Sequence, residues 1–148
     1  MKLKIEISSG GIVYKRIYDP RSKIYNLKWL ITQHSQHKGW GFPKGLIGDQ
    51  KKDEPMKEAA LREVEEEGGI KTKIVNHKPV KVNYNYRFKE FLVKKTVYYF
   101  LMEYISGDPK NHDWEVSEAK FVTEEEVRKT LTFKTDKQAF EEILRLMK

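Results

Sequence analysis

Apolar residues along the chain fall mostly in short runs that predict β-strands, with helices between some of them. Runs rich in β-branched and aromatic residues and bounded by turn-forming residues are typical of strands. The segments with this character are Lys4–Tyr14, Tyr25–Thr32, Ile70–Val82, Lys95–Tyr104 and Ala119–Thr123. Asp19–Ser22 contains aspartate, proline and serine, and it predicts the turn between the first two strands.

A helix is predicted downstream of Asp53, which can cap it, with Glu54 and Pro55 in its first turn. Gly68 and Gly69 predict the end of this helix, because glycine readily takes the left-handed conformation common there. Apolar residues at helical spacing predict its buried face: Met56, Ala60, Val64 and Ala59.

Two more helices are predicted after residue 120. Thr123 and Glu126 form a capping-box pattern for a short helix over Glu124–Lys129. The last helix is predicted to begin at Thr135 or Asp136. Its core-facing side is predicted from residues that recur at helical spacing: Phe140, Ile143, Leu144 and Met147. The order of elements predicts an α/β fold of the α+β type, a mixed β-sheet sandwiched between α-helices.

Three carboxylates on the first predicted helix point to chemistry. Glu63, Glu66 and Glu67 are three and four residues apart, so they share one face of the helix. Like charges at this spacing repel, and helix stability does not require them. A hard divalent cation such as Mg²⁺ or Mn²⁺ prefers oxygen ligands of this kind. The ordinary alternative is a solvated charged face.

The residues around these carboxylates resemble the Nudix box, G-x5-E-x7-R-E-U-x-E-E-x-G-U, where U is aliphatic. All nine specified positions are filled: Gly48, Glu54, Arg62, Glu63, Val64, Glu66, Glu67, Gly69 and Ile70. From average composition, a chance match in such a chain is on the order of 10⁻⁷ to 10⁻⁵. The resemblance implies a Nudix fold over a single domain, residues 1–148, that hydrolyses phosphoanhydrides with the help of a divalent metal.

The first glycine of the motif is ambiguous. In the family it usually ends a W-x-x-P-K-G stretch, which is present here as Trp40–Gly45. Gly45 has the expected neighbours, whereas Gly48 has the expected spacing. A three-residue insertion within 48–53 would explain both. The resemblance also implies a main-chain carbonyl ligand to the metal from Lys44 or a neighbour.

The resemblance implies a role for each polar residue of the box. Glu63, Glu66 and Glu67 are expected to bind the metal, and Arg62 to orient the carboxylates. Glu54 is expected to brace the loop or Arg62 through a hydrogen bond.

Family members often add a carboxylate from a distant loop. Glu115 is our choice as metal ligand or base, because it precedes the aromatic Phe121 by six residues. Glu118 is the alternative, and a plain surface role is open for both.

Shorter matches resemble the asymmetrical diadenosine tetraphosphatase branch of the family. They lie in Trp40–Gly45, Val82–Tyr84, Lys95–Phe100 and Phe133–Lys134. Lys95 and Tyr99 would share one face of a strand and suit a phosphate contact beside a base-stacking ring. Ordinary sheet packing is the alternative for Tyr99. The resemblance thus implies these substrate-binding residues: Lys44, Lys95, Tyr99, Tyr84 and Phe133.

Composition bears on the cellular location of the protein and on the charge of its partner, but it does not identify the substrate. The sequence has no cysteine, no membrane-length apolar stretch and no signal-peptide core, which suits a cytoplasmic protein. The formal charge of +7 favours an anionic partner such as a polyphosphate or nucleic acid. His34 and His37 precede Trp40 without zinc-ligand spacing, so no zinc site is predicted.

The expected substrate is a nucleoside diphosphate-linked compound, first a dinucleoside polyphosphate such as diadenosine tetraphosphate, giving ATP and AMP. Within the same chemistry, the alternatives are an RNA 5′ end, a diphosphoinositol polyphosphate or a nucleoside triphosphate. A different class of function is a non-catalytic Nudix ligand-binding domain or a nucleic-acid-binding domain. The basic residues that would serve the latter are Lys71, Lys73, Lys78, Lys81, Arg87 and Lys89.

Overall fold

A mixed sheet, built around one long strand, organises the protein. The computed structural model describes residues 1–47 and 54–147. Within these ranges, seven strands form one sheet with the order β3-β2-β1-β6-β5, in which β4 also pairs with β1 and β7 with β2. The strands are β1 (Lys2–Asp19), β2 (Ile24–His34), β3 (Trp40–Gly41), β4 (Lys44–Leu46), β5 (Ile70–Phe88), β6 (Phe91–Gly107) and β7 (Val116–Val122).

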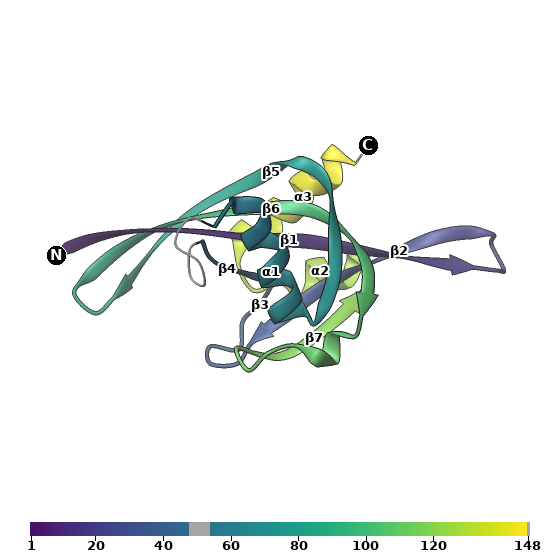
Figure 1. The fold of residues 1–148 in the computed structure, drawn as a ribbon, viewed down its shortest axis with the longest axis horizontal. Helices are drawn as coiled ribbons and strands as arrows, with labels where there is room; N and C mark the ends of the chain where they lie inside the picture. Colours follow the sequence, from purple (N-terminus) through teal and green to yellow (C-terminus); the bar gives the residue numbers. More distant parts are fainter. Residues whose placement is uncertain (48–53, 148) are drawn as a thin grey trace.

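Helices cover both faces of the sheet. They are α1 (Met56–Gly68), the short 3-10 helix η1 (Pro109–Asn111), α2 (Glu124–Thr130) and α3 (Lys134–Leu146). Figure 1 shows α1 on one face, with α2 and α3 on the other. Strand β1 runs parallel to β6 and antiparallel to β2 and β4. The predicted fold class, a mixed sheet between helices, is therefore confirmed.

The strands alternate between two buried clusters, because successive side chains point to opposite faces. Ile12 of β1 packs in a cluster with Phe140 of α3, while the next residue, Val13, packs in a cluster with Val64 of α1. All three predicted alanine and valine positions of the α1 face are buried, and Met56 packs at the edge of its cluster. The sheet thus separates two buried clusters, one on each face, and apolar burial holds α1 against one of these faces.

Most of the strands are longer than the sequence predicted. Strand β1 continues to Asp19 and β5 to Phe88, past the ends at Tyr14 and Val82. Figure 1 shows these extensions as two arms beyond the helices. None of the described helices covers the arms (Figure 1), so the residues of the arms lack the buried pattern that marks a strand in sequence. Cross-strand contacts such as the Tyr18–Tyr25 ring pair, 5.2 Å between centroids, support them instead.

The first helix begins later than predicted. Pro55 is extended, with ψ 145°, and occupies the N-cap position, so Glu54 and Pro55 precede the helix. Glu54 is instead buried. The proposed cap, Asp53, lies outside the described residues. The predicted end is confirmed, because Gly69 has φ +72° and its N–H donates to the Glu65 carbonyl.

The last two helices follow the predictions with small shifts. The capping box of Thr123 and Glu126 is present at the start of α2. Helix α3 begins at Lys134, slightly earlier than predicted, and Phe133 occupies its N-cap position. Met147 follows the helix and is exposed, so its prediction as a core residue is wrong. None of the helices in the described part of the chain is long and apolar enough to span a membrane.

Candidate active site

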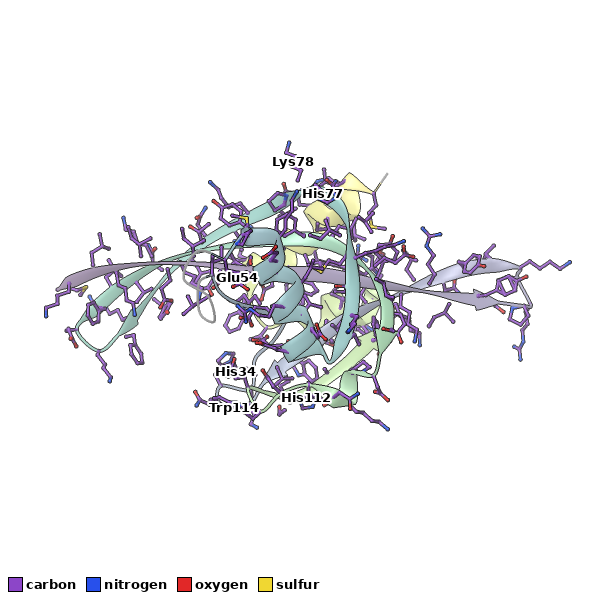
Figure 2. All side chains as sticks on the ribbon, viewed as in Figure 1. His34, Glu54, His77, Lys78, His112 and Trp114 are labelled. Atoms are coloured by element: carbon purple, nitrogen blue, oxygen red, sulfur yellow. The ribbon has the colours of Figure 1, made fainter. Side chains whose placement is uncertain are left out.

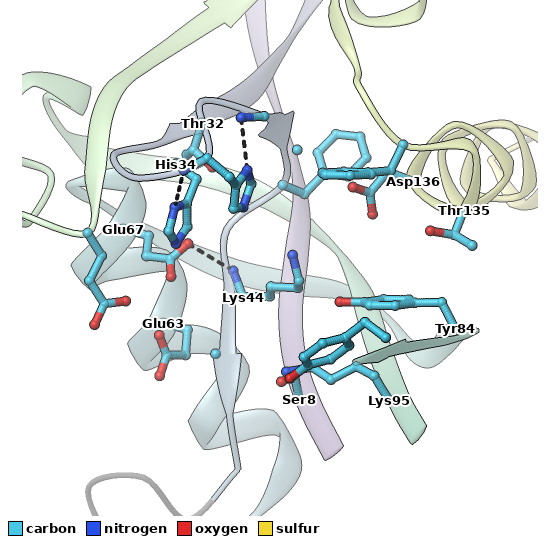
Figure 3. Close-up of a pocket in the computed structure, with 18 of the residues that line it drawn as sticks. Ser8, Thr32, His34, Lys44, Glu63, Glu67, Tyr84, Lys95, Thr135 and Asp136 are labelled. Carbon is cyan, nitrogen blue, oxygen red and sulfur yellow. Dashed lines mark hydrogen bonds between the residues drawn. The ribbon is translucent and has the colours of Figure 1, made fainter. Parts of the chain in front are cut away.

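A cavity of about 930 Å³ brings together residues from distant parts of the chain. It lies between α1, the strands β1, β4, β5 and β6, and the start of α3. Figure 3 shows Glu63 and Glu67 on one side of it and Tyr84 and Lys95 on another. The predicted site residues that line this cavity are Lys44, Glu63, Glu67, Tyr84, Lys95, Glu115 and Phe133. Arg62, Glu66 and Tyr99 do not line it.

Arg62 ties the carboxylates of the Nudix box together. Its guanidinium donates to both carboxylate oxygens of Glu54, at 2.7 and 2.8 Å, as expected for a brace. The same guanidinium donates to Glu63 at 2.8 Å and to Glu66 at 3.2 Å. Figure 2 shows Glu54 beside α1. Arg62 therefore orients these acids, as the family resemblance implied, and does not reach the cavity itself.

The Glu63 carboxylate packs directly against the main chain of Gly45. A Cβ at Gly45 would lie 2.1–2.2 Å from the Glu63 carboxylate, closer than any side chain can be placed. The carboxylate therefore requires a glycine at this position. This contact favours Gly45 as the structural glycine of the motif. The alternative, Gly48, and the suggested insertion lie outside the described residues.

Burial makes the two cavity-facing glutamates unusual acids. Desolvation raises the pKa of Glu67 to about 8, against the attraction of Lys44, whose main-chain N–H donates to Glu67 Oε1 at 3.3 Å. Desolvation also raises the pKa of Glu63 to about 7, although Arg62 opposes the shift. Repulsion from Glu115 adds to both shifts. A cation placed among the Glu63, Glu67 and Glu115 carboxylates would offset their mutual repulsion.

The carboxylates of the box do not all converge in this structure. Helical spacing turns Glu63 and Glu67 toward the cavity, whereas Glu66 lies to the side in its ion pair with Arg62. Across residues 1–47 and 54–147, no three acidic, cysteine or histidine side chains lie close enough to hold an ion. The assignment of Glu63, Glu66 and Glu67 as metal ligands, like that of the Lys44 main-chain carbonyl, stays a prediction.

The distant carboxylate at the cavity is Glu115. It lines the cavity, whereas Glu118 is exposed on β7 and pairs with Lys120 at 3.7 Å. The main chain fixes the position of Glu115, because its carbonyl accepts from Ser35 N–H at 2.9 Å. Its own N–H donates to the Asp113 carboxylate at 3.1 Å. The structure thus favours the first of the two predicted candidates.

Tyr99 is not a cavity residue, and this part of the prediction is wrong. Its ring is fully buried in the α3-side core, and its hydroxyl donates to Asp136 Oδ1 at 2.8 Å. Tyr99 lies on the predicted face of β6, but α3 covers that face at the position of Tyr99. Its neighbour on that face, Lys95, does reach the cavity and pairs with Glu6 at 3.4 Å. Ordinary packing, the alternative named for Tyr99, is what the structure has.

Some cavity residues were not predicted to bind substrate. His34 and His37 stack with ring centroids 4.1 Å apart, and each Nδ1 accepts a main-chain N–H. Asp136 is buried and lines the cavity near Gly41. Ser8 lines it from β1. No sequence motif surrounds Ser8 or Asp136, and only the fold shows that both side chains line the same cavity.

Comparison with known proteins gives the family. A family model described as the NUDIX domain matches residues 17–143. "Putative mutator protein MutT4" of Mycobacterium tuberculosis is 28% identical over 142 residues, which are 95% of this chain and 55% of that protein. "Putative 8-oxo-dGTP diphosphatase YtkD" of Bacillus subtilis is 39% identical over 75 residues, 49% of this chain and 41% of that protein. The chain spans about half the length of these relatives.

Solved structures share the fold. The Ap4A hydrolase of Caenorhabditis elegans in a binary complex gives a TM-score of 0.77 at 20% identity, covering 96% of this chain and 97% of that chain. The NUDIX domain of Shewanella oneidensis NrtR complexed with ADP ribose gives 0.69 at 21% identity, covering 100% and 91%. With the family model matching most of its length, the chain belongs to the NUDIX family, whose hydrolases act on phosphorus-containing anhydrides.

Proposed function

We propose that this chain is a metal-dependent hydrolase of nucleoside polyphosphates, with dinucleoside polyphosphates such as diadenosine tetraphosphate as first candidates. One observation carries the proposal: a single cavity holds buried carboxylates, ammonium groups and aromatic rings. Glu63 and Glu67 stand on one side, Tyr84 and Lys95 on another, and Lys44 lies between them (Figure 3). These are the groups needed for a metal ion, phosphate oxygens and a base.

The residues present fit a divalent cation, on which Nudix hydrolases generally depend. Glu63 is buried, Glu67 is partly buried, and the two carboxylates repel each other. Glu63, Glu67 and Glu115 would hold Mg²⁺ or Mn²⁺, which supplies charge neutralisation and activates water. Glu66 would join them by leaving its ion pair with Arg62.

The remaining cavity residues would bind the substrate. Lys44 and Lys95 provide ammonium groups for phosphate oxygens, and Tyr84 and Phe133 offer rings for bases. Hydrolysis adds the oxygen of water to one phosphorus atom, and the bridging oxygen leaves with its electron pair and gains a proton. Diadenosine tetraphosphate would yield ATP and AMP. The similarly folded Ap4A hydrolase supports this choice of substrate.

A nucleoside triphosphate is the second candidate. The relative from Bacillus subtilis bears the name of an 8-oxo-dGTP diphosphatase. Asp136 favours the same idea, because its carboxylate lines the cavity and would accept hydrogen bonds from a base.

A substrate panel tests the proposal. Purified protein would be incubated with Mg²⁺ and diadenosine tetraphosphate, 8-oxo-dGTP, unmodified nucleoside triphosphates or 5′-triphosphorylated RNA, and products identified by chromatography. We expect turnover of diadenosine tetraphosphate to ATP and AMP, abolished by EDTA. Glu67→Gln should lower turnover by about 100-fold or more, while Glu65→Gln, exposed on the same helix, serves as the matched control. Absence of metal-dependent turnover on every compound would refute the proposal.

A further inference from the structure

Two adjacent serines of β1 differ in a way that points to a ligand. Ser8 and Ser9 are both fully buried. The Ser9 hydroxyl donates to the Met56 carbonyl at 3.1 Å. Among the described residues, the Ser8 Oγ is the buried side-chain oxygen or nitrogen that has no hydrogen-bond partner. Such orphaned groups cost stability and are uncommon in native proteins, so this one requires an explanation.

Ser8 lies at one end of the cavity, which we call the lysine end and define by Ser8, Lys44, Tyr84 and Lys95. All four line the cavity, and Figure 3 shows Ser8, Tyr84 and Lys95 away from Glu63 and Glu67, with Lys44 between the two groups. They come from four strands, β1, β4, β5 and β6. The lysine end is therefore built by the sheet, whereas Glu63 and Glu67 come from α1.

Lys95 is held in place at the lysine end. Glu6, two residues before Ser8 and on the same face of β1, pairs with the Lys95 ammonium at 3.4 Å. The Tyr86 hydroxyl donates to the same Glu6 oxygen at 2.5 Å. This carboxylate therefore already has partners and is directed at Lys95, leaving the Ser8 hydroxyl unused.

The four side chains of the lysine end are all hydrogen-bond donors. Two ammonium groups, a phenol and a hydroxyl call for a ligand with several acceptor oxygens and negative charge. A phosphate group has this chemistry. A purely steric role for Ser8, in which a small residue is needed between Leu46 and Val97, predicts no dependence on the hydroxyl.

We propose that the Ser8 hydroxyl donates to a phosphate oxygen at the lysine end, on a phosphate other than the one attacked by water. The site thus selects substrates whose phosphate chain extends from the carboxylates to Lys95. This inference rests on the proposed function, and it adds Ser8 as a substrate-binding residue and Glu6 as a positioning residue for Lys95.

The two serines provide a matched pair of variants. Tripolyphosphate binding would be measured by calorimetry in EDTA, so that no metal contributes, together with the melting temperature. We expect Ser8→Ala to weaken binding roughly tenfold, as for a lost hydrogen bond to a charged group, without lowering the melting temperature. Ser9→Ala should lower the melting temperature and leave binding unchanged. With a hydrolysed nucleotide, Ser8→Ala should raise KM and spare kcat.

Each outcome decides between the alternatives. Unchanged tripolyphosphate affinity of Ser8→Ala would show that the hydroxyl has only a packing role. Failure of the wild-type protein to bind tripolyphosphate would also overturn the inference. If binding depends on Ser8 while no nucleotide is hydrolysed, the phosphate site stands and the proposed hydrolase activity fails.

Discussion

The two ends of the cavity are built in opposite ways. On the carboxylate side, Arg62 joins Glu54, Glu63 and Glu66, all close together in the chain, through direct ion pairs. At the lysine end, the residues come from four strands, and the hydroxyl of one of them, Ser8, has no hydrogen-bond partner among residues 1–47 and 54–147. The Arg62 ion pairs thus orient the carboxylates within the protein itself, whereas at the lysine end the proposed phosphate supplies the partner of Ser8.

Breaking the brace of the carboxylate side should have the largest effect. Arg62→Ala removes the cation from three carboxylates, two of which are buried. Removing one partner of a buried ion pair typically costs about 3–5 kcal/mol. We expect a correspondingly large loss in the free energy of unfolding by urea denaturation. Lys57→Ala, exposed on the same helix, is the control, and equal stability of both variants would contradict the assigned role.

Removing a cavity-facing carboxylate should affect turnover more than stability. Glu67→Gln is expected to lower kcat by about 100-fold or more, because a lost metal ligand removes several kcal/mol of charge stabilisation. Steady-state kinetics at saturating Mg²⁺ measures the effect. Full activity in this variant would exclude Glu67 from the metal site.

The contact between Gly45 and Glu63 gives a test of which glycine, Gly45 or Gly48, is the structural glycine of the motif. Gly45→Ala places a methyl group where the Glu63 carboxylate lies, so this carboxylate must move. We expect kcat to fall by about tenfold or more, as for a displaced reacting group. Gly48→Ala should be mild in the same assay. The reverse order would make Gly48 the structural glycine.

At the substrate side, two tyrosines should behave differently. Tyr84→Ala should raise KM about tenfold if its ring stacks on a base, since one stacked base is worth about 1–3 kcal/mol. Tyr99→Phe should instead lower the melting temperature, because it removes the buried hydrogen bond to Asp136, and leave KM unchanged. A raised KM in Tyr99→Phe alone would invert these assignments.

The smallest expected effect is the pH dependence of stability without metal. Burial raises the pKa of Glu67 from 4.5 to about 8, so the folded protein binds this proton more tightly than the unfolded chain. Its contribution is complete below pH 4.5 and is lost as the pH rises through about 8. We expect the melting temperature in EDTA to fall over this range, less steeply in Glu67→Gln. Identical slopes would contradict a buried, ionising Glu67.

The comparison of the two ends also explains what the sequence could predict. The carboxylate side was predictable because Glu63, Glu66 and Glu67 share one helix, whose period fixes their directions, and because the motif pairs Glu54 with Arg62. The lysine end was only partly predictable. Alternation along β6 placed Lys95 and Tyr99 on one face, but sequence does not tell how far α3 extends over that face. Ser8 and Asp136 have no local pattern, because their surroundings come from distant strands.

The parallel pairing of β1 with β6 has a consequence for how the protein forms. Lys2 stands opposite Phe91 and Tyr14 opposite Glu103, so this central ladder joins segments very far apart in the chain. Contacts of such long range form slowly, because bringing distant segments together costs chain entropy before the contacts can form. During synthesis, β1 has no β6 to pair with until more than half of the chain has left the ribosome. Helix α1 shares its buried cluster with Phe100 and Met102 of β6, so both ends of the cavity should mature only after β6 is in place.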